Sequence, residues 1–347
     1  MKRLRPIFAW ALWIALCTAV LFAQPVPISQ VEAVGVTVSD MDRSAAFYTH
    51  VLHFQKISDV ELTGPQIEHL KGVFGVRVRI VRLQLGNEDL ELSEYLAPEG
   101  RPLPPDSRSN DLWFQHVAIV VSNMDEAYAW LRQNHVGYVS SGPQTLPVWN
   151  AQASGIQAFY FHDPDDHVLE VIHFPPGKGD PKWQQKNELF LGIDHTAIAV
   201  SDTDASLAFY RDVLGMRVVG TSENYGDEQE HLNNVFGAHL RITSLRAPHG
   251  PGVELLEYLA PRSGRPIPVD LKANDVAHWE TVVDSSDLEN ARSFFNKSST
   301  QLISSGIESV QFSAANSRKG FLLKDPDGHV IAEMNDIAPG NTSAQGR

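Results

Sequence analysis

The sequence predicts an α+β fold built from four βαβββ modules, and two observations support this prediction. The first is a tandem repeat: Val38-Ser39-Asp40 and Phe47-Tyr48 recur 162 residues later as Val200-Ser201-Asp202 and Phe209-Tyr210. The second is a finer repeat. Each half contains two segments in which a short apolar strand leads through Ser, Asp or Asn into an amphipathic helix, followed by further strand-like stretches. The chain is therefore a duplicated pair of modules.

Helix and turn signals define the elements inside each module. Asp40 and Asp202 stand where a side-chain oxygen can cap a helix N-terminus. The apolar residues that follow the second cap fall at helical spacing: Leu207, Tyr210, Val213 and Leu214. Gly215 then suits the C-terminus of that helix. In the second and fourth modules, an Asp-Pro-Asp turn at 163–165 and 325–327 precedes the last strand.

The repeat also predicts the domain boundaries. We expect two domains of two modules each, with a flexible tail after them: 28–177 (modules 28–98 and 112–177), 190–336 (modules 190–261 and 275–336) and the tail 337–347. Modules adjacent in sequence are expected to pair, because the linkers within the two halves match and the repeat is tandem. The alternative is that the second module pairs with the third.

Composition and charge exclude some classes of protein. The 347 residues are 43% hydrophobic and 20% charged, which is typical of a globular chain. The formal net charge is −14, and a surface this acidic repels phosphate backbones. We therefore expect a small-molecule substrate and no nucleic-acid partner. The sequence leaves both a monomer and a homo-oligomer open.

The first 23 residues have the pattern of a secretory signal peptide. Lys2, Arg3 and Arg5 form a basic start, and residues 7–23 are apolar and uncharged. We expect an exported protein, periplasmic or secreted, with no stable membrane span once the signal is removed; the alternative is a membrane anchor through 7–23. Cys17, the only cysteine, lies in this segment, so the mature chain has no disulfide or cysteine nucleophile.

The repeated motifs resemble those of the vicinal oxygen chelate superfamily, which includes glyoxalase I, bleomycin resistance proteins and extradiol dioxygenases. The motifs are a His-led strand before Ser-Asp and Phe-Tyr-x-x-Val-Leu, and Asp-Pro-Asp-x-His-x-x-Glu at 163–170. The resemblance covers about residues 30–336. It implies that paired modules curl their sheets into half-open cups, and that side chains from the first and last strands hold a divalent ion inside a cup.

The resemblance implies a set of candidate ligands in each module. The first-strand positions are Ala33, His116, His195 and His278, and the last-strand positions are Glu91, Glu170, Glu254 and Ala332. Imidazole and carboxylate are suitable ligands for Fe, Mn, Zn or Ni, with one ion expected in each active cup. Glu333, one residue past the last position, should point away from the cup because strand side chains alternate.

Pairing of adjacent modules would give each domain three of the four ligands. The first domain would offer Glu91, His116 and Glu170, and the second would offer His195, Glu254 and His278. If the second and third modules pair instead, one cup holds the complete set of His116, Glu170, His195 and Glu254.

The resemblance also implies alternative functions. With Glu170 and Glu254 as catalytic carboxylates, the site would act as a glyoxalase-like lyase or isomerase; with two His and one Glu around iron or manganese, it would act as an extradiol dioxygenase. A non-catalytic binding protein of the bleomycin-resistance type is the third possibility. Candidate substrate contacts are Tyr95 and Tyr258, which otherwise fill the cups, and His69 and His231, which otherwise lie on helix surfaces.

Overall fold

The computed structural model describes residues 25–185, 187–313 and 316–337. The predicted signal peptide lies outside these ranges, as does the predicted tail 337–347 except for Ile337, which ends a strand. Within them, no helix is long and apolar enough to cross a membrane.

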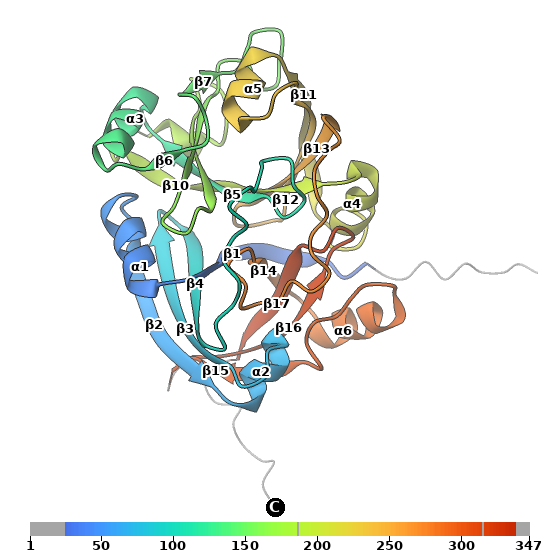
Figure 1. Ribbon diagram of the computed structural model, residues 1–347. Coiled ribbons are helices and arrows are strands. Elements are labelled where there is room, and N and C mark those ends of the chain that lie inside the picture. The colour runs from blue at the N-terminus through green and yellow to red at the C-terminus, as the bar shows by residue number, and fades with distance from the viewer. Residues whose placement is uncertain (1–24, 186, 314–315, 338–347) are drawn as a thin grey trace, which may run out of the picture.

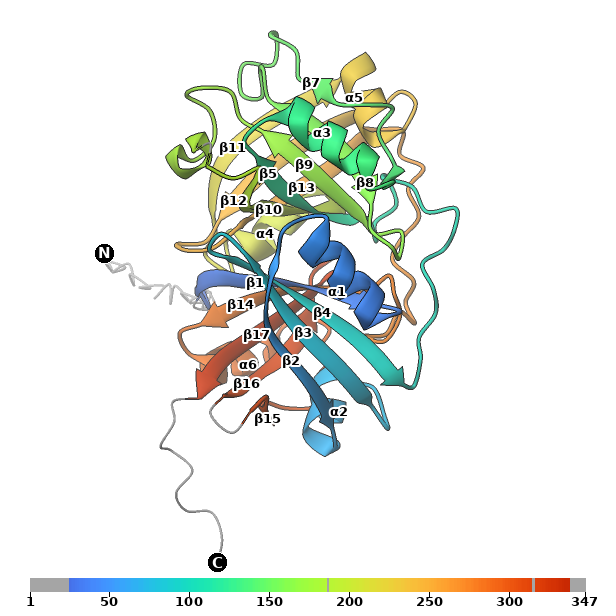
Figure 2. The ribbon, with the colours of Figure 1, turned by 90° about the vertical axis from the view of Figure 1, so that its left-hand side faces the viewer.

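The described chain forms two curled sheets, one above the other in Figure 2. The first sheet has the strand order β15 (Glu308–Gln311), β16 (Ser317–Lys324), β17 (Val330–Ile337), β14 (Trp279–Ser285), β1 (Ile28–Val38), β4 (Glu88–Ala97), β3 (Arg77–Leu85) and β2 (Gln55–Thr63). The second has the order β11 (Arg217–Tyr225), β12 (His239–Arg246), β13 (Gly252–Ala260), β10 (Phe190–Val200), β5 (Gln115–Val121), β9 (Val168–His173), β8 (Gln157–His162) and β6 (Gly137–Tyr138), with β7 (Gln144–Thr145) also paired to β8.

The sheets do not follow the expected pairing of adjacent modules. Strands β1 and β14 pair antiparallel and join modules one and four, whereas β5 and β10 join modules two and three. The division into cups within 28–177 and 190–336 is therefore wrong, and the alternative pairing of modules two and three is the one observed.

The linkers explain this arrangement. The backbone N–H of Arg101, after module one, donates to Asp275 at the start of module four (2.8 Å), and the Arg101 guanidinium binds the same carboxylate. Arg265, after module three, makes the same two contacts with Asp111 before module two. Each linker is thus fixed beside the start of a distant module, and a chain folded in this way places adjacent modules in different sheets.

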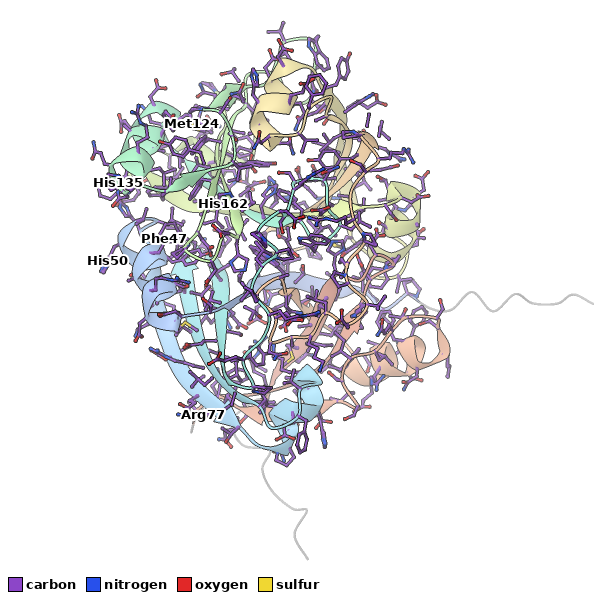
Figure 3. All side chains as sticks on the ribbon, viewed as in Figure 1. Phe47, His50, Arg77, Met124, His135 and His162 are labelled. Atoms are coloured by element: carbon purple, nitrogen blue, oxygen red, sulfur yellow. The ribbon has the colours of Figure 1, made fainter. Side chains whose placement is uncertain are left out.

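Modules adjacent in sequence pack against each other through the helix-covered faces of the two sheets. Helices α1 (Met41–His50) and α3 (Met124–Gln133) contribute to one apolar core, and α4 (Thr203–Tyr210) and α6 (Leu288–Lys297) contribute to another. Figure 3 shows Phe47 on α1 and Met124 on α3 on the same side of the molecule. The short helices α2 (Pro65–Lys71) and α5 (Asp227–Asn233) lie at opposite ends in Figure 1, and a 3₁₀ helix (Pro181–Gln184) interrupts the linker between the halves.

The predicted N-caps are confirmed. Asp40 accepts a hydrogen bond from the N–H of Arg43 (2.9 Å), and Asp202 accepts from Asp204 and Ala205 (2.8 and 3.1 Å). The predicted stripe residues Leu207, Tyr210 and Leu214 are buried and Val213 is partly buried in the same core. Helix α4 ends at Tyr210, five residues before the predicted end at Gly215. Gly215 instead takes a left-handed conformation, with a φ of 72°, in the turn that leads into β11.

The first Asp-Pro-Asp turn joins three modules through a buried aspartate. Asp163 accepts hydrogen bonds from the hydroxyl of Tyr48 in module one (3.1 Å) and from Nδ1 of His167 (3.0 Å). His167 Nε2 donates to the carbonyl of Val276, at the start of module four (2.7 Å). Both ring nitrogens thus face acceptors, which requires a protonated imidazole.

We expect this junction to lose stability at alkaline pH. Burial lowers the pKa of His167, but Asp163 and the Val276 carbonyl outweigh this effect and raise the pKa to about 9. The contribution is therefore complete below about pH 6.5 and is lost as the pH rises through 9. From a raised pKa of this size, we expect it to be on the order of 3 kcal/mol.

Urea unfolding between pH 6 and 9.5 checks this expectation for the wild type and His167→Gln. The difference in unfolding free energy between the two proteins should shrink as the pH rises. A difference that stays constant over this range would contradict the proposed protonation.

Glu333, one residue past the last-strand ligand position, points away from the cup, as strand alternation predicts. It pairs with Val283 and Phe321, two members of the helix-side core, and its exposure is 0%. Burial raises the pKa of this carboxyl to about 8, against a smaller opposing effect of Ser285. The side chain therefore adds most stability below about pH 4.5, and this contribution is lost as the pH rises through 8.

Glu333→Gln is accordingly expected to stabilise the protein by roughly 3 kcal/mol at pH 7 and by less than 1 kcal/mol at pH 5. Thermal unfolding of both proteins at the two pH values measures the change. A variant that is less stable than the wild type at pH 7 would show that the ionised carboxylate is satisfied in the folded state.

Candidate metal centre

The cup formed by modules two and three gathers two histidines and two glutamates from its four central strands. His116 Nε2 on β5 lies 3.2 Å from Oε2 of Glu170 on β9. His195 Nε2 on β10 lies 3.6 Å from that same oxygen and 3.3 Å from Oε2 of Glu254 on β13. His116, Glu170 and His195 are buried, and their ligand atoms all lie within 4.8 Å of one another.

The strand register explains why these four side chains meet. His116 is the cross-strand partner of Ala197, whose own partner on β13 is Glu254. In the same way, His195 pairs with Ala118, whose partner on β9 is Glu170. Because side chains alternate along each strand, this register places all four on one face, the concave one. The alternative set inferred from the sequence is therefore the set that comes together.

The donor set fits a divalent cation. Ligands at about 2.0–2.2 Å from one ion are about 3.0–3.5 Å from each other, and the three separations above are close to this range. Burial lowers the pKa of His195, but Glu254, Asp194 and Glu170 outweigh it and raise the pKa to about 9. The site thus attracts positive charge at the place where the ligand atoms converge.

A buried carboxylate orients one of the two histidines. Asp194 lies 2.9 Å from His195 Nδ1, so the Nδ1–H donates to it and leaves Nε2 free to ligate. Asp194 also accepts from the indole N–H of Trp183 in the interhalf linker and from the guanidinium of Arg246 on β12, both at 2.7 Å. In contrast, Nδ1 of His116 has no hydrogen-bond partner in the described chain.

The two glutamates differ in their freedom to move. The Glu170 side chain is 6% exposed and lies between the two histidines. The Glu254 side chain is 22% exposed at the cavity wall, and its Oε1 accepts a 2.5 Å hydrogen bond from the Ser244 hydroxyl. Glu254 is therefore better placed than Glu170 to leave a ligand position and take part in proton transfer.

A cavity of about 730 Å³ opens in front of the cluster. Glu170, His195 and Glu254 lie on its wall together with Tyr160, whose ring centroid is 4.8 Å from that of His116. Burial raises the pKa of the Tyr160 phenol well above its usual value, so the hydroxyl stays protonated and can donate a hydrogen bond into the cavity.

In the cup of modules one and four, the first-strand position of module four is Glu280 and not His278. Gly35 on β1 pairs with Glu280 as Ala197 pairs with His116. The prediction of His278 as the first-strand residue was therefore wrong by two positions. Asp111 precedes His116 by five residues, and Asp275 precedes Glu280 by the same number. The prediction chose the nearest histidine and did not use this spacing.

The corresponding positions in this cup are Ala33, Glu91, Glu280 and Ala332, and protein cations neutralise its carboxylates. Glu91 lies 3.3 Å from Arg82 and 3.4 Å from the buried Arg318. Lys71 Nζ lies 2.7 Å from both oxygens of Glu280, which is also 2.9 Å from His278 Nε2. Burial raises the pKa of Glu280, but Lys71 and His278 outweigh it and hold the pKa at about 2. Apolar side chains fill much of the remaining interior.

The four predicted substrate contacts do not line the cavity in front of the His-Glu cluster. The Tyr258 hydroxyl accepts a 2.7 Å hydrogen bond from Asn233 in the packed interior, and Tyr95 is buried in the other cup. His231 is exposed on α5, and His69 on α2 lies 3.7 Å from Glu308. These positions agree with the alternative interpretations, in which the tyrosines fill the cups and the histidines lie on helix surfaces.

Sequence reasoning missed four residues of the site: Tyr160, Trp183, Asp194 and Arg246. Asp194 could have been found from the sequence, because it directly precedes the candidate ligand His195. A charged residue inside an apolar strand is also costly unless it is paired. Trp183 and Arg246 are distant in sequence, and only the folded chain brings them to Asp194.

Two curled sheets of βαβββ modules, with a His-His-Glu-Glu cluster in one cup that could hold a metal ion, define a protein of the glyoxalase-like architecture. The profile of the Glyoxalase/Bleomycin resistance protein/Dioxygenase superfamily matches residues 30–171 and 192–332, and the chain belongs to this superfamily. The resemblance inferred from the motifs is thus confirmed, as is the fold class of four βαβββ modules in two cups.

Two curated relatives are enzymes. A 2-epi-5-epi-valiolone epimerase from Actinomyces sp. is 31% identical over 171 residues, which cover 46% of this chain and 86% of the relative. A lactoylglutathione lyase from Schizosaccharomyces pombe is 25% identical over 58% of this chain and 62% of its own length.

Solved structures agree on the fold. Glyoxalase I from Zea mays matches with a TM-score of 0.56 at 13% identity, covering 88% of this chain and 92% of that one. A putative dioxygenase from Bacillus subtilis matches with a TM-score of 0.54 at 13% identity, covering 89% and 86%.

Proposed function

We propose that the protein is a metal-dependent lyase or isomerase that moves a proton at a carbon next to a carbonyl, on a substrate with two adjacent oxygen atoms. The observation that carries this proposal is the pair of inequivalent glutamates at one cluster. Relatives of both kinds, an epimerase and a lactoylglutathione lyase, support it.

His116, Glu170, His195 and Glu254 would hold the ion. Bound there, a divalent cation such as Zn, Ni, Mn or Fe would act as a Lewis acid toward the substrate oxygens. Glu254, at the cavity wall, would take the proton from carbon and return it, while Ser244 fixes its second oxygen. Tyr160 would donate a hydrogen bond to the substrate, and the buried strands would exclude water from the deep side of the site.

The decisive experiment is solvent proton exchange with the reconstituted protein. In D₂O, 2-hydroxy ketones and the hemithioacetal of methylglyoxal should gain deuterium at carbon in the presence of the wild type. Glu254→Gln should slow this exchange by about 10²–10⁴-fold, the usual contribution of a general base. Glu91→Gln, at the equivalent position of the other cup, should leave it unchanged. Equal rates for both variants would contradict the role of Glu254.

A second candidate function rests on the buried trio alone. His116, His195 and Glu170 form a two-histidine, one-carboxylate set, a common ligand set of iron enzymes that use O₂. Oxygen consumption with catechols by the Fe(II)-loaded protein would favour this extradiol activity over proton transfer. Tight ligand binding that needs neither metal nor His195 would favour the non-catalytic binding protein.

A further inference from the structure

A second cavity, of about 160 Å³, lies where the linker after module one meets modules two, three and four. We call it the seam pocket. Its wall combines Ser107 and Arg108 of that linker with Phe114 at the start of module two, Asn233 at the end of α5 and Trp279 of β14. It has no lining residue in common with the cavity in front of the cluster. A ligand bound there would therefore occupy a separate site.

The equivalent place beside the other cup is almost closed. Residues 101–111 and 265–275 align at a spacing of 164, which places Leu271 where the seam pocket has Ser107. A space of only about 10 Å³ remains beside Leu271 and His329. The seam pocket is therefore specific to the cup that carries the cluster, and the pairing of modules does not by itself create it.

Three buried aromatic rings form the deep end of the seam pocket. Trp113, Phe114 and Trp279 all line it and are at most 8% exposed. The Trp113 indole is held in place, because its N–H donates a 3.1 Å hydrogen bond to Ser107 and the guanidinium carbon of Arg265 lies 4.5 Å from its ring centroid. A cavity of about 150 Å³ with apolar walls is large enough for one benzene ring. The seam pocket thus has the size and the walls to hold a single aromatic ring.

The hydroxyl and imidazole groups at the deep end already have partners. Ser107 Oγ donates to the Pro104 carbonyl (2.6 Å), and Ser109 Oγ donates to the Asn233 carbonyl (2.7 Å). Both ring nitrogens of His167, which also lines the seam pocket, are hydrogen-bonded as described above. An apolar ring can therefore bind here without leaving these groups unpaired.

The open end of the seam pocket carries one charge of each sign. Arg108 from the linker and Asp166 from the turn between β8 and β9 both line it and are exposed. The backbone N–H of Arg108 donates to Asp111 and the backbone carbonyl of Asp166 accepts from His162, but in the described chain neither side chain forms an ion pair. Both charges are thus free to pair with a ligand that carries opposite charges close to its ring.

We propose that the seam pocket binds the zwitterion of an α-amino acid with one aromatic ring, such as phenylalanine. The ring would lie among the three buried aromatic side chains. The ligand carboxylate would face Arg108, and its ammonium group would face Asp166, in charge-assisted hydrogen bonds. The proposal does not depend on the proposed function. The two sites are nevertheless neighbours, because the ring centroid of Phe114 lies 5.5 Å from that of His116.

Isothermal titration calorimetry with three phenyl compounds tests the proposal. L-phenylalanine carries both charges, 3-phenylpropanoate only the carboxylate, and 2-phenylethylamine only the ammonium group. The full chain should bind L-phenylalanine at least about 10-fold more tightly than either, the gain expected from one hydrogen bond to a charged group. Arg108→Gln should bind L-phenylalanine no more tightly than 2-phenylethylamine. Asp166→Asn should bind it no more tightly than 3-phenylpropanoate, and asparagine tolerates the φ of 67° at this position.

Lys272→Gln is the matched control, because Lys272 is exposed and lies 164 residues after Arg108, in the second linker. It should bind all three compounds as the wild type does. Ser107→Leu, which introduces the side chain found at Leu271, should abolish binding while circular dichroism shows a folded chain. Treatment of the wild type with a chelator should leave the affinity unchanged.

Three results would each overturn the proposal. They are equal binding of the three compounds, no binding to the wild type, and binding that the chelator abolishes, which would place the ligand at the metal. Because Arg108 and Asp166 are exposed, their variants test the site even if Ser107→Leu does not fold.

Discussion

Elemental analysis of the purified protein is expected to find one divalent ion per chain, and His195→Ala is expected to abolish its retention. The reason is that the four ligand positions are occupied by His116, Glu170, His195 and Glu254 in one cup, whereas Arg82, Arg318 and Lys71 neutralise the carboxylates of the other. A second cation there would have to displace buried protein cations that already satisfy Glu91 and Glu280.

Loss of a residue that hydrogen-bonds to a metal ligand lowers metal affinity by about 10–100-fold, and removal of a ligand itself should lower it further. The test is metal content after dialysis against a weak chelator, with His116→Ala as a second loss variant. His278→Gln is the control, because His278 is also buried but lies beside Glu280 in the other cup. Circular dichroism confirms that each variant folds. Two ions per chain, or loss of metal from the control, would contradict the assignment of a single site.

Asp194→Asn is expected to lower metal affinity by about 10–100-fold without removing any ligand. The wild-type carboxylate accepts the Nδ1–H of His195 and so keeps Nε2 unprotonated toward the cluster. An asparagine amide can present its NH₂ group instead, which favours the tautomer with hydrogen on Nε2 and blocks ligation. The lost negative charge also reduces the basicity of the imidazole.

The other cup supplies a control for this prediction. Glu32 lies 162 residues before Asp194, at the equivalent position, and its carboxylate binds Arg82 and Arg318. Glu32→Gln should leave metal affinity unchanged, whereas Trp183→Phe, which removes one hydrogen bond to Asp194, should give an intermediate loss. Affinity is measured by competition with a chromophoric chelator. If Glu32→Gln and Asp194→Asn behave alike, Asp194 stabilises the fold and does not position His195.

Much of the fold could be predicted from the sequence, because the sequence signals for helices and turns depend on nearby residues. Asp40 and Asp202 cap helices by accepting hydrogen bonds from N–H groups two or three residues away. The repeat identified the four modules, and the family resemblance suggested the candidate ligand positions. His116, Glu170, His195 and Glu254 were proposed as candidate ligands because polar residues inside apolar strands need partners, and the structure brings these four side chains together.

The tertiary structure decided which of these candidates meet. Sequence repeats carry no information about which edge of a module pairs with which, so the tandem order favoured adjacent modules. The observed pairing depends on long-range contacts such as Arg101 with Asp275 and Arg265 with Asp111, formed between residues more than 150 positions apart. The same contacts place His116 beside His195, and they leave Glu91 with an arginine in place of a metal. Local chemistry specified the modules, and non-local packing specified the site.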